Sequence, residues 1–381
     1  MVYRKIGVGL LGYSSMGKAH SFAYKVMPHF FWPPPAIPEL VTICGRTESR
    51  LKAASENFGF KKYTMDWREM VRDEQVEVVD NSLPNDMHHD VTISALEAGK
   101  HVLCEKPLAR NSLEAKEMWE ASCRTSAKAM VAFNYRFVPA VLLARELIKS
   151  RKLGRIYHFR ARYLQQWLAD PSFPLVWRLV ESRAGSGPIG DLGSHIVDLA
   201  RFMVGEVKAV TAVTRTFVKE RPLPDDSSTK GPVTVEDAFA ATVEFDNGAI
   251  GTLEASRCAA GRKNYNNFEV NGEDGSIEFN LERLNELRFF SREGDVKTLG
   301  WNEILATDKV HDYTLPYRPH GDALGWNHTF VSEVYHFIDA IVNDKEIGPI
   351  GATFEDGYLN NVILDAIIKS AKEDKKVNIT L

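Results

Sequence analysis

The sequence contains few cysteines, no long apolar run and no large excess of either charge. Its four cysteines, Cys44, Cys104, Cys123 and Cys258, are far apart and form no C-x-x-C pair, which indicates a reducing compartment rather than a disulfide framework. No uninterrupted apolar run reaches about 18 residues, so we expect no membrane partner. The 47 basic and 51 acidic residues leave a net charge of −4. Without a basic run interleaved with aromatic residues, nucleic acid is not an expected ligand.

What is present fits an ordinary globular protein with room for two domains. Hydrophobic residues make up 44% and charged residues 26% of the chain, as in typical globular domains. A length of 381 residues is long for one compact domain. The first residues lack the ordered regions of a signal peptide, so we expect a cytoplasmic location.

Up to about residue 130, short apolar segments alternate with amphipathic ones. This alternation predicts an α/β domain, a doubly wound parallel sheet of the Rossmann type covered by helices on both faces. The expected strands are Lys5–Leu11, Leu40–Cys44, Val76–Asn81 and His101–Cys104, and the expected helices are Met16–Met27, Ser49–Asn57 and Asp90–Ala98.

A proline-rich segment interrupts this pattern. Five prolines between Met27 and Pro38 predict irregular structure there. The segment either packs its aromatic residues as a stiff loop or forms one wall of a ligand pocket.

From about Gly154 the pattern changes to longer strands joined by tight turns. Asn247-Gly248 is a favourable hairpin turn because both residues tolerate positive φ. Consecutive hairpins predict an α+β domain with an open, mainly antiparallel sheet. We therefore divide the chain into a first domain, residues 1–132, and a second domain, residues 133–381. The expected strands are Ile156–Trp167, Val207–Val218, Ala238–Phe245, Ala249–Ala255, Phe268–Asn271 and Ser276–Leu281, followed by helices Phe330–Asn343 and Tyr358–Lys372.

A glycine turn follows the first predicted strand. Gly7-x-Gly9-x-x-Gly12 matches the dinucleotide fingerprint formally, but it lies inside the strand and is rejected. In the segment Gly12–Gly17, Gly12 provides the tight turn and Gly17 allows close helix–sheet packing. Ser14 replaces the middle glycine and is small enough for backbone N–H groups to approach a pyrophosphate.

The end of the second predicted strand bears on the choice of coenzyme. Gly45 stands where a carboxylate would bind the ribose 2′-hydroxyl of NAD, and Arg46 follows it. A guanidinium without a carboxylate favours the 2′-phosphate of NADP. Arg46 stacking on adenine or facing solvent is the alternative.

Spaced motifs follow one another along the chain: Gly12–Gly17, Leu83-Pro84-Asn85 with His88, Ala98–Pro107, Asn134-Tyr135-Arg136 and Asp191-x-Gly-x-His195-x-x-Asp198. Together they resemble the Gfo/Idh/MocA oxidoreductase family over essentially the whole length. The resemblance implies that residues 1–132 bind a dinucleotide coenzyme and that residues 133–381 bind substrate and pair the subunits into homodimers or homotetramers. It also implies a catalytic lysine, aspartate and histidine, Lys106, Asp191 and His195, and a cis bond between Lys106 and Pro107. The coenzyme-binding residues expected in this way are Gly12, Ser14, Ser15, Met16, Gly45, Arg46, Ser82, Leu83, Pro84, Asn85, His88, Glu105 and Lys106.

The chemistry of alcohol oxidation agrees with these roles. His195 is the best general base because an imidazole titrates nearest neutral pH. Asp191, four residues earlier, is expected to orient the imidazole or hold a neighbouring hydroxyl, and Lys106 to stabilise a developing alkoxide. A helix-surface pair, or metal ligation together with Asp198, is the alternative. No second histidine or cysteine spacing supports a metal.

Residues of the second domain provide the polar groups and aromatic platforms that sugar recognition needs. Arg136 could equally support the lysine loop. The expected substrate-binding residues are Lys106, Tyr135, Arg136, Gln165, Trp167, Trp177, Arg178, Asp191 and His195.

We therefore predict an NAD(P)-dependent dehydrogenase that oxidises a secondary hydroxyl of a sugar or cyclitol. Two segments, Gly17–Tyr24 with Phe30–Pro33 and Tyr163–Pro171, resemble the branch of the family that oxidises C3 of levoglucosan with NAD. That resemblance favours NAD slightly over NADP. The alternatives are an inositol dehydrogenase, a redox-neutral NAD-dependent glycosidase and a non-catalytic dinucleotide sensor.

Overall fold

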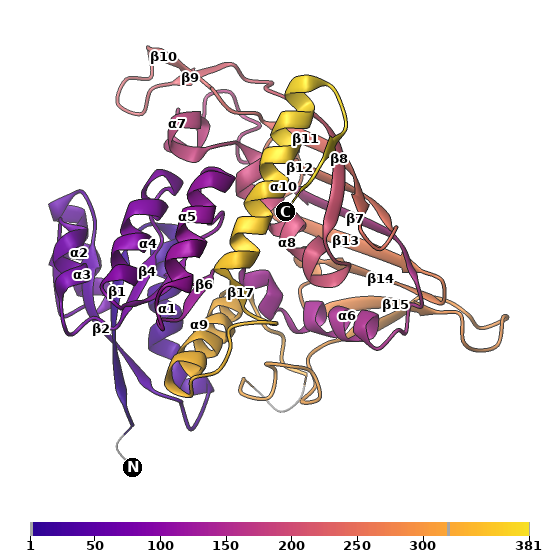
Figure 1. Ribbon diagram of the computed structural model, residues 1–381, viewed down its shortest axis with the longest axis horizontal. Helices are drawn as coiled ribbons and strands as arrows, with labels where there is room; N and C mark the ends of the chain where they lie inside the picture. Colours follow the sequence, from indigo (N-terminus) through magenta and orange to yellow (C-terminus); the bar gives the residue numbers. More distant parts are fainter. Residues whose placement is uncertain (1–2, 318–320, 381) are drawn as a thin grey trace.

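The first sheet is parallel apart from one edge strand and is covered by helices on both faces (Figure 1). The computed structural model describes residues 3–317 and 321–380. Each strand is parallel to its neighbour except β17, which runs antiparallel to β6. The strands lie in the order β17 (Ala352–Thr353), β6 (Ala129–Val131), β5 (His101–Cys104), β4 (Val78–Asn81), β1 (Lys5–Leu11), β2 (Ile37–Cys44) and β3 (Lys62–Thr64).

Two separate apolar clusters explain why the strands of this sheet are apolar on both faces. Val8 and Val78 contribute to one cluster, and Leu11 and Val79 to the other. Because successive side chains of a strand point to opposite faces, such strands must be covered on both sides. Helices α1 (Ser15–Phe30), α2 (Glu48–Phe58) and α9 (Trp326–Val342) contribute to the first cluster, and α3 (Trp67–Arg72), α4 (His88–Glu97) and α5 (Ser112–Cys123) to the second.

The second sheet is mainly antiparallel. One pair, β7 with β12, is parallel, and the other neighbours in the sheet run antiparallel. Its strands lie in the order β16 (Asn302–Leu305), β15 (Glu286–Ser291), β14 (Gly275–Asn280), β13 (Tyr265–Gly272), β7 (Ile156–Leu164), β12 (Ile250–Ser256), β11 (Ala238–Phe245), β8 (Val207–Arg215) and β18 (Val377–Asn378). The hairpin of β9 (Glu220–Pro222) and β10 (Lys230–Pro232) is separate from both sheets.

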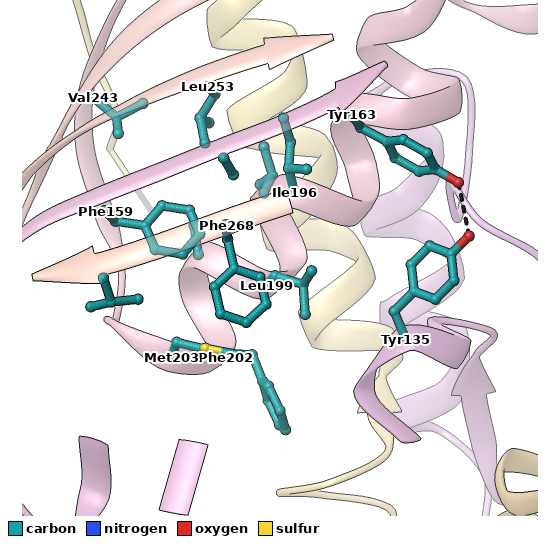
Figure 2. Packing of buried hydrophobic residues seen from close by; sticks show 14 of the residues in the cluster. Tyr135, Phe159, Tyr163, Ile196, Leu199, Phe202, Met203, Val243, Leu253 and Phe268 are labelled. Carbon is teal, nitrogen blue, oxygen red and sulfur yellow. Dashed lines mark hydrogen bonds between the residues drawn. The ribbon is translucent and has the colours of Figure 1, made fainter. Parts of the chain in front are cut away.

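One face of the second sheet is buried under helices and forms the largest apolar cluster. Figure 2 shows Phe159 and Phe268 of this sheet beside Ile196 and Leu199. The opposite face is left open, so buried and exposed residues alternate along β11 and β12. The covering helices are α6 (Pro139–Lys149), α8 (Ser194–Met203) and α10 (Phe354–Glu373), and a short helix, α7 (Glu181–Ala184), lies outside this layer.

The predicted fold class is confirmed: a Rossmann-type parallel sheet precedes an open, mainly antiparallel one. The predicted strands of the second sheet at Ile156–Trp167 and Val207–Val218 were too long, because β7 ends at Leu164 and β8 at Arg215. Past Leu164 the chain leaves the sheet and turns along the cleft described below. The division at residue 132 stays a prediction. Helix α9 and strand β17 lie after residue 132 in the chain, but α9 packs on the first sheet and β17 pairs with β6.

The prediction of irregular structure between Met27 and Pro38 was wrong at both ends. Helix α1 continues through Pro28, and β2 already begins at Ile37. Proline suits helical φ, and in the last turn its missing N–H removes a single hydrogen bond. Phe31 packs inward, with its ring stacked on Tyr335 at a centroid distance of 3.8 Å, whereas Trp32 is exposed. None of residues 27–38 lines the cleft described below.

Candidate active site

A cleft of about 610 Å³ lies at the carboxyl ends of the parallel strands and extends along the second sheet. Loops at the carboxyl ends of parallel strands are the usual place for a ligand in this type of sheet. The cleft is lined by eighteen of the twenty-one site residues expected from the sequence. These are Gly12, Ser14, Ser15, Met16, Gly45, Arg46, Ser82, Leu83, Pro84, Asn85, Glu105, Lys106, Tyr135, Gln165, Trp177, Arg178, Asp191 and His195.

The glycine turn has the geometry needed at a pyrophosphate site. Gly12 has a φ of +96°, and a side chain there would lie 2.9 Å from the Ser82 carbonyl oxygen. A Cβ at Gly17 would meet the Gly12 carbonyl oxygen at 2.3 Å. Helix α1 begins directly after Ser14, whose side chain does not cap the helix. Its first backbone N–H groups can therefore bind a phosphate.

The far end of the same cleft is formed where β2 ends. A Cβ at Gly45 would lie 2.2 Å from the Tyr13 ring, so the ring occupies the space of any side chain at this position. Arg46, Thr47 and Arg50 line the cleft beside it. Together they form a polar, cationic surface that fits an adenosine ribose or its 2′-phosphate.

His88 does not line the cleft. It is completely buried, and its ring nitrogens lie 2.9 Å from the carbonyl oxygen of Leu83 and 3.0 Å from that of Pro107. The ring therefore joins the loop after β4 to the loop after β5. The predicted cis bond between Lys106 and Pro107 is confirmed.

Lys106, Asp191 and His195 lie together in the cleft. The Lys106 ammonium donates to the Asp191 backbone carbonyl at 2.9 Å, and Nζ lies 3.4 Å from the carboxylate Oδ1. On the other side of that carboxylate, Arg257 Nη1 lies 3.4 Å from Oδ2. The described residues show no hydrogen bond between Asp191 and His195, and His195 Nδ1 has no partner among them. The two cations, rather than the imidazole, hold the aspartate.

Burial and charge place Asp191 and His195 in different protonation states. Burial alone would raise the pKa of Asp191, but Lys106, Arg178 and Arg257 together hold it well below its usual range. Burial lowers the pKa of His195 far below its ordinary value, and the charge of Lys106 lowers it further. At neutral pH the site therefore contains a carboxylate and a neutral imidazole, the form in which histidine accepts a proton.

A chain of hydrogen bonds lines the part of the cleft that extends along the second sheet. The Tyr135 and Tyr163 hydroxyls lie 2.8 Å apart (Figure 2). Tyr163 and Gln165 each donate to Asn264 Oδ1, at 2.7 and 2.8 Å. The Arg178 guanidinium lies 4.4 Å from the centroid of the Trp177 ring. Fixed donors, acceptors and aromatic faces of this kind are what a sugar requires.

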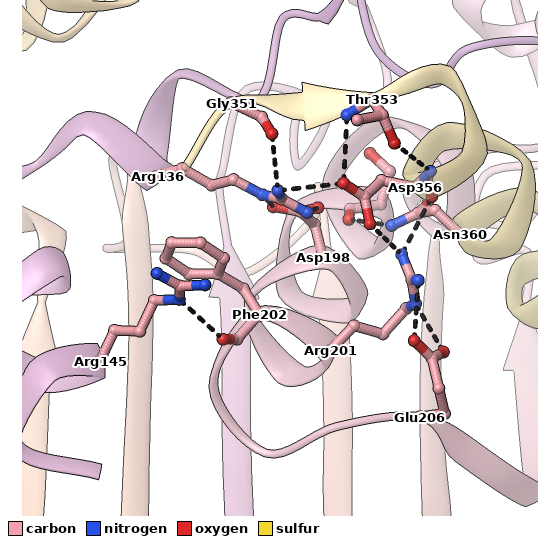
Figure 3. A network of polar contacts seen from close by, with 11 residues as sticks. Arg136, Arg145, Asp198, Arg201, Phe202, Glu206, Gly351, Thr353, Asp356 and Asn360 are labelled. Atoms are coloured by element: carbon pink, nitrogen blue, oxygen red, sulfur yellow. Dashed lines mark hydrogen bonds and ion pairs between the residues drawn. The ribbon is translucent and has the colours of Figure 1, made fainter. Parts of the chain in front are cut away.

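Two residues expected to contact substrate lie outside this lining. Trp167 donates to Gln165 Oε1 at 2.9 Å and packs on Phe173, so it supports the wall from behind. Arg136 is 3% exposed and makes two hydrogen bonds, at 2.6 and 2.8 Å, to the Asp198 carboxylate (Figure 3). Both carboxylate oxygens of Asp198 therefore accept hydrogen bonds from Arg136. The described residues contain no group of three or more His, Cys, Asp or Glu side chains able to hold a metal.

Sequence reasoning missed several residues of the cleft. Arg257 follows the end of β12, and its position at a strand end was the available signal. Trp326 and Phe330 come from α9, which nothing in the sequence placed beside the glycine turn. The lining residues that were not expected are Tyr13, Cys44, Thr47, Arg50, Met65, Trp67, Met87, Pro107, Asn134, Tyr163, Ala184, Ser186, Leu192, Arg257, Asn264, Trp326 and Phe330.

In the described part of the chain, no helix combines the length and apolar character that crossing a membrane requires.

Two family models match the chain in succession. Residues 6–133 match the oxidoreductase family, NAD-binding Rossmann fold, and residues 141–278 match the GFO/IDH/MocA C-terminal domain.

Characterised proteins align with nearly the whole chain. The levoglucosan dehydrogenase of Pseudarthrobacter phenanthrenivorans is 42% identical, over 99% of this chain and 98% of its own length. The inositol 2-dehydrogenase of Rhizobium meliloti is 24% identical over 97% and 98%. Among solved structures, levoglucosan dehydrogenase in complex with NADH and levoglucosan has a TM-score of 0.95 at 42% identity, covering 99% of this chain and all of its own.

Proposed function

Because the chain belongs to the Gfo/Idh/MocA oxidoreductase family, we propose that it is an NAD(P)-dependent dehydrogenase that oxidises a secondary hydroxyl of a sugar. The proposed substrate is levoglucosan or a related pyranose, oxidised at C3 to the ketone. The observation that carries the proposal is the meeting of Lys106, Asp191 and His195 in one cleft with the glycine turn. The 42% identity with a levoglucosan dehydrogenase supports the choice of substrate.

The side chains of the cleft divide the reaction between them. A bound nicotinamide supplies the acceptor for the hydride that leaves the carbinol carbon with its electron pair. The neutral His195 imidazole takes the hydroxyl proton. Lys106 donates a hydrogen bond to the reacting oxygen and stabilises its developing negative charge. The ionised Asp191 accepts a hydrogen bond from a neighbouring sugar hydroxyl, which fixes the ring relative to the base.

We propose NAD as the coenzyme, with NADP as a weaker alternative. The NADH complexes of the similar levoglucosan dehydrogenase support NAD. Arg46 and Arg50 line the adenosine end without a carboxylate at position 45, so the 2′-phosphate of NADP meets favourable charge there.

We further propose that the protein forms homodimers or homotetramers through the open face of the second sheet. The apolar side chains exposed on that sheet include Val213 at 57% and Ile250 at 53%. Arg160 and Glu269 lie among them, and such a mixture of apolar and charged groups suits a self-complementary interface. We place the protein in the cytoplasm, consistent with its free cysteines.

The test is the reduction of NAD and NADP by the purified protein with levoglucosan, glucose and myo-inositol. We expect turnover with levoglucosan and NAD. His195→Ala should lower turnover by roughly 10²–10⁴-fold and leave coenzyme affinity, measured by NADH fluorescence, unchanged. Turnover with myo-inositol alone would identify a cyclitol dehydrogenase. Sugar cleavage without net NADH would identify a redox-neutral glycosidase.

A further inference from the structure

A buried histidine lies between two buried carboxylates behind the Lys106 loop. His20 Nδ1 lies 2.8 and 2.9 Å from the two carboxylate oxygens of Asp80, and Nε2 lies 3.1 Å from Glu105 Oε1. All three side chains are at most 6% exposed. The reaction described above uses none of them directly.

These three residues come from three elements that form the coenzyme side of the cleft. His20 is on α1, the helix that begins at the glycine turn. Asp80 is in β4, two residues before Ser82, which lines the cleft. Glu105 directly precedes Lys106, and its second carboxylate oxygen accepts a hydrogen bond from the Lys106 backbone N–H at 3.1 Å. The histidine is therefore connected through one side chain to the backbone of the proposed catalytic lysine.

The contacts determine the charge of the ring. Both ring nitrogens face carboxylate oxygens, which only accept hydrogen bonds, so both must carry a proton. Burial lowers the pKa of His20, but Asp80 and Glu105 raise it more, and the net direction is well above the ordinary value. The same contacts lower the pKa of Glu105 despite its burial.

Two further buried ionisable groups lie near the cluster: Glu333 interacts with His20, and Tyr24 interacts with Asp80. Glu333 of α9 is completely buried without a partner for either oxygen among the described residues, and burial raises its pKa well above the ordinary value. Tyr24 of α1 is also buried, and burial and Asp80 raise its pKa. Both are therefore neutral, so neither of them adds a charge beside the ring.

We propose that His20 is a positioning residue: as a doubly protonated ring it fixes Glu105, and through Glu105 it fixes the backbone of Lys106 relative to the coenzyme-binding turn. The expected effect of His20 on kcat rests on the role in turnover proposed above for Lys106. The geometry of the cluster itself does not depend on which sugar is oxidised.

The first test replaces the ring by a neutral amide. His20→Gln can donate to one carboxylate but cannot supply a charge between the two, so we expect Lys106 to shift and kcat to fall by about 10- to 100-fold. Met27→Ala is the matched control, because Met27 is buried on the same helix two turns further on and its apolar side chain cannot form a hydrogen bond or ion pair with the three groups. It should lower Tm and leave kcat unchanged. An equal kcat in His20→Gln and the wild type would overturn the proposal.

The second test does not require turnover. In the intact protein with NADH bound, selective ¹⁵N labelling of histidine and lysine reports the His20 ring and the Lys106 amide, with His20→Gln and Lys106→Arg assigning the signals. We expect both ring nitrogens to be protonated at pH 7 and the Lys106 amide signal to move in His20→Gln but not in Met27→Ala. A neutral ring or an unmoved amide would refute the positioning role. Absence of turnover with every sugar, with these shifts present, would instead count against the proposed function.

Discussion

Asp191 and His195 are four residues apart in the chain, yet the same site favours the charged form of one and the neutral form of the other. Cations contact both carboxylate oxygens of Asp191. His195 has no carboxylate partner among the described residues and lies in an aromatic environment, with its ring centroid 4.5 Å from that of Tyr135. An acid and a base with separated pKa values are what a proton-transfer site needs.

This arrangement predicts the pH dependence of sugar oxidation. A base with a lowered pKa loses its proton at lower pH, so His195 remains neutral below the ordinary histidine pKa of about 6.5. We expect the acid limb of kcat/KM to lie below pH 6.5 in the wild type. A limb at or above pH 6.5 would show that His195 is not the desolvated base. Coenzyme affinity measured across the same range serves as the control.

Residue types and spacing were sufficient to predict the catalytic candidates but not the residues that hold them. Lys106 and His195 stand in recognisable motifs, and both line the cleft. Arg136 stands in an equally recognisable motif but lies buried against Asp198. Whether a charged side chain faces a cleft or a buried partner depends on contacts between distant segments, which no local pattern encodes.

At the scale of elements, a buried ion network joins α8, the helix that carries His195, to its neighbours (Figure 3). Arg136, from the turn after β6, contacts Asp198 of α8 and lies 3.3 Å from Asp356 of α10. Arg201 of α8 lies 3.3 Å from the other oxygen of Asp356 and also binds Glu206. Since His195 is one turn before Asp198, this network sets the position of α8 in the cleft.

Breaking the buried part of this network should be costly. Asp198→Asn leaves the Arg136 guanidinium buried with only the partly exposed Asp356 as a counter-ion. Removing one partner of a buried pair typically costs about 3–5 kcal/mol, so we expect a clear fall in the free energy of unfolding by urea titration. Glu206→Gln, at the exposed end of the network, is the control and should cost at most about 1 kcal/mol. Equal effects of the two variants would contradict a special role for the buried pair.

The sequence predicted where the strands lie better than it predicted which elements pack against one another. The bounds of β1, β5 and β11 agree with the predicted ones, because alternation and tight turns are local signals. The apolar pattern of α9 predicted a helix but could not show that it packs against α1 and the first sheet. The end of α1 was also missed, since its last turn accommodates Pro28.

At the scale of the whole molecule, α10 connects the two sides of the cleft. Asn361 donates to the Ala109 carbonyl, shortly after the Lys106 loop, and Asn360 donates to the Ser194 carbonyl at the start of α8, both at 2.9 Å. Helix α9 likewise packs on α1 while contributing Trp326 to the cleft. The two sheets therefore share helices as well as a ligand site.

We expect the two sheets to unfold together and coenzyme to stabilise them together. Calorimetry should show one transition that moves to higher temperature with NADH. At a hundred times its Kd, the coenzyme adds about 2.7 kcal/mol to the free energy of unfolding. Two transitions, with only the first shifted by NADH, would show that the shared helices do not couple the sheets. The destabilised Met27→Ala variant serves as the reference. NADH should raise its unfolding temperature by about as much as that of the wild type.

The contact between Tyr13 and Gly45 restricts how this chain can change its coenzyme during evolution or engineering. The simplest single change toward strict NAD selectivity, an acidic residue at position 45, meets the Tyr13 ring at 2.2 Å from Cβ. Such a residue fits only if the Tyr13 ring moves away or position 13 carries a smaller side chain. We therefore expect the two positions to be epistatic, so a library should vary positions 13 and 45 together.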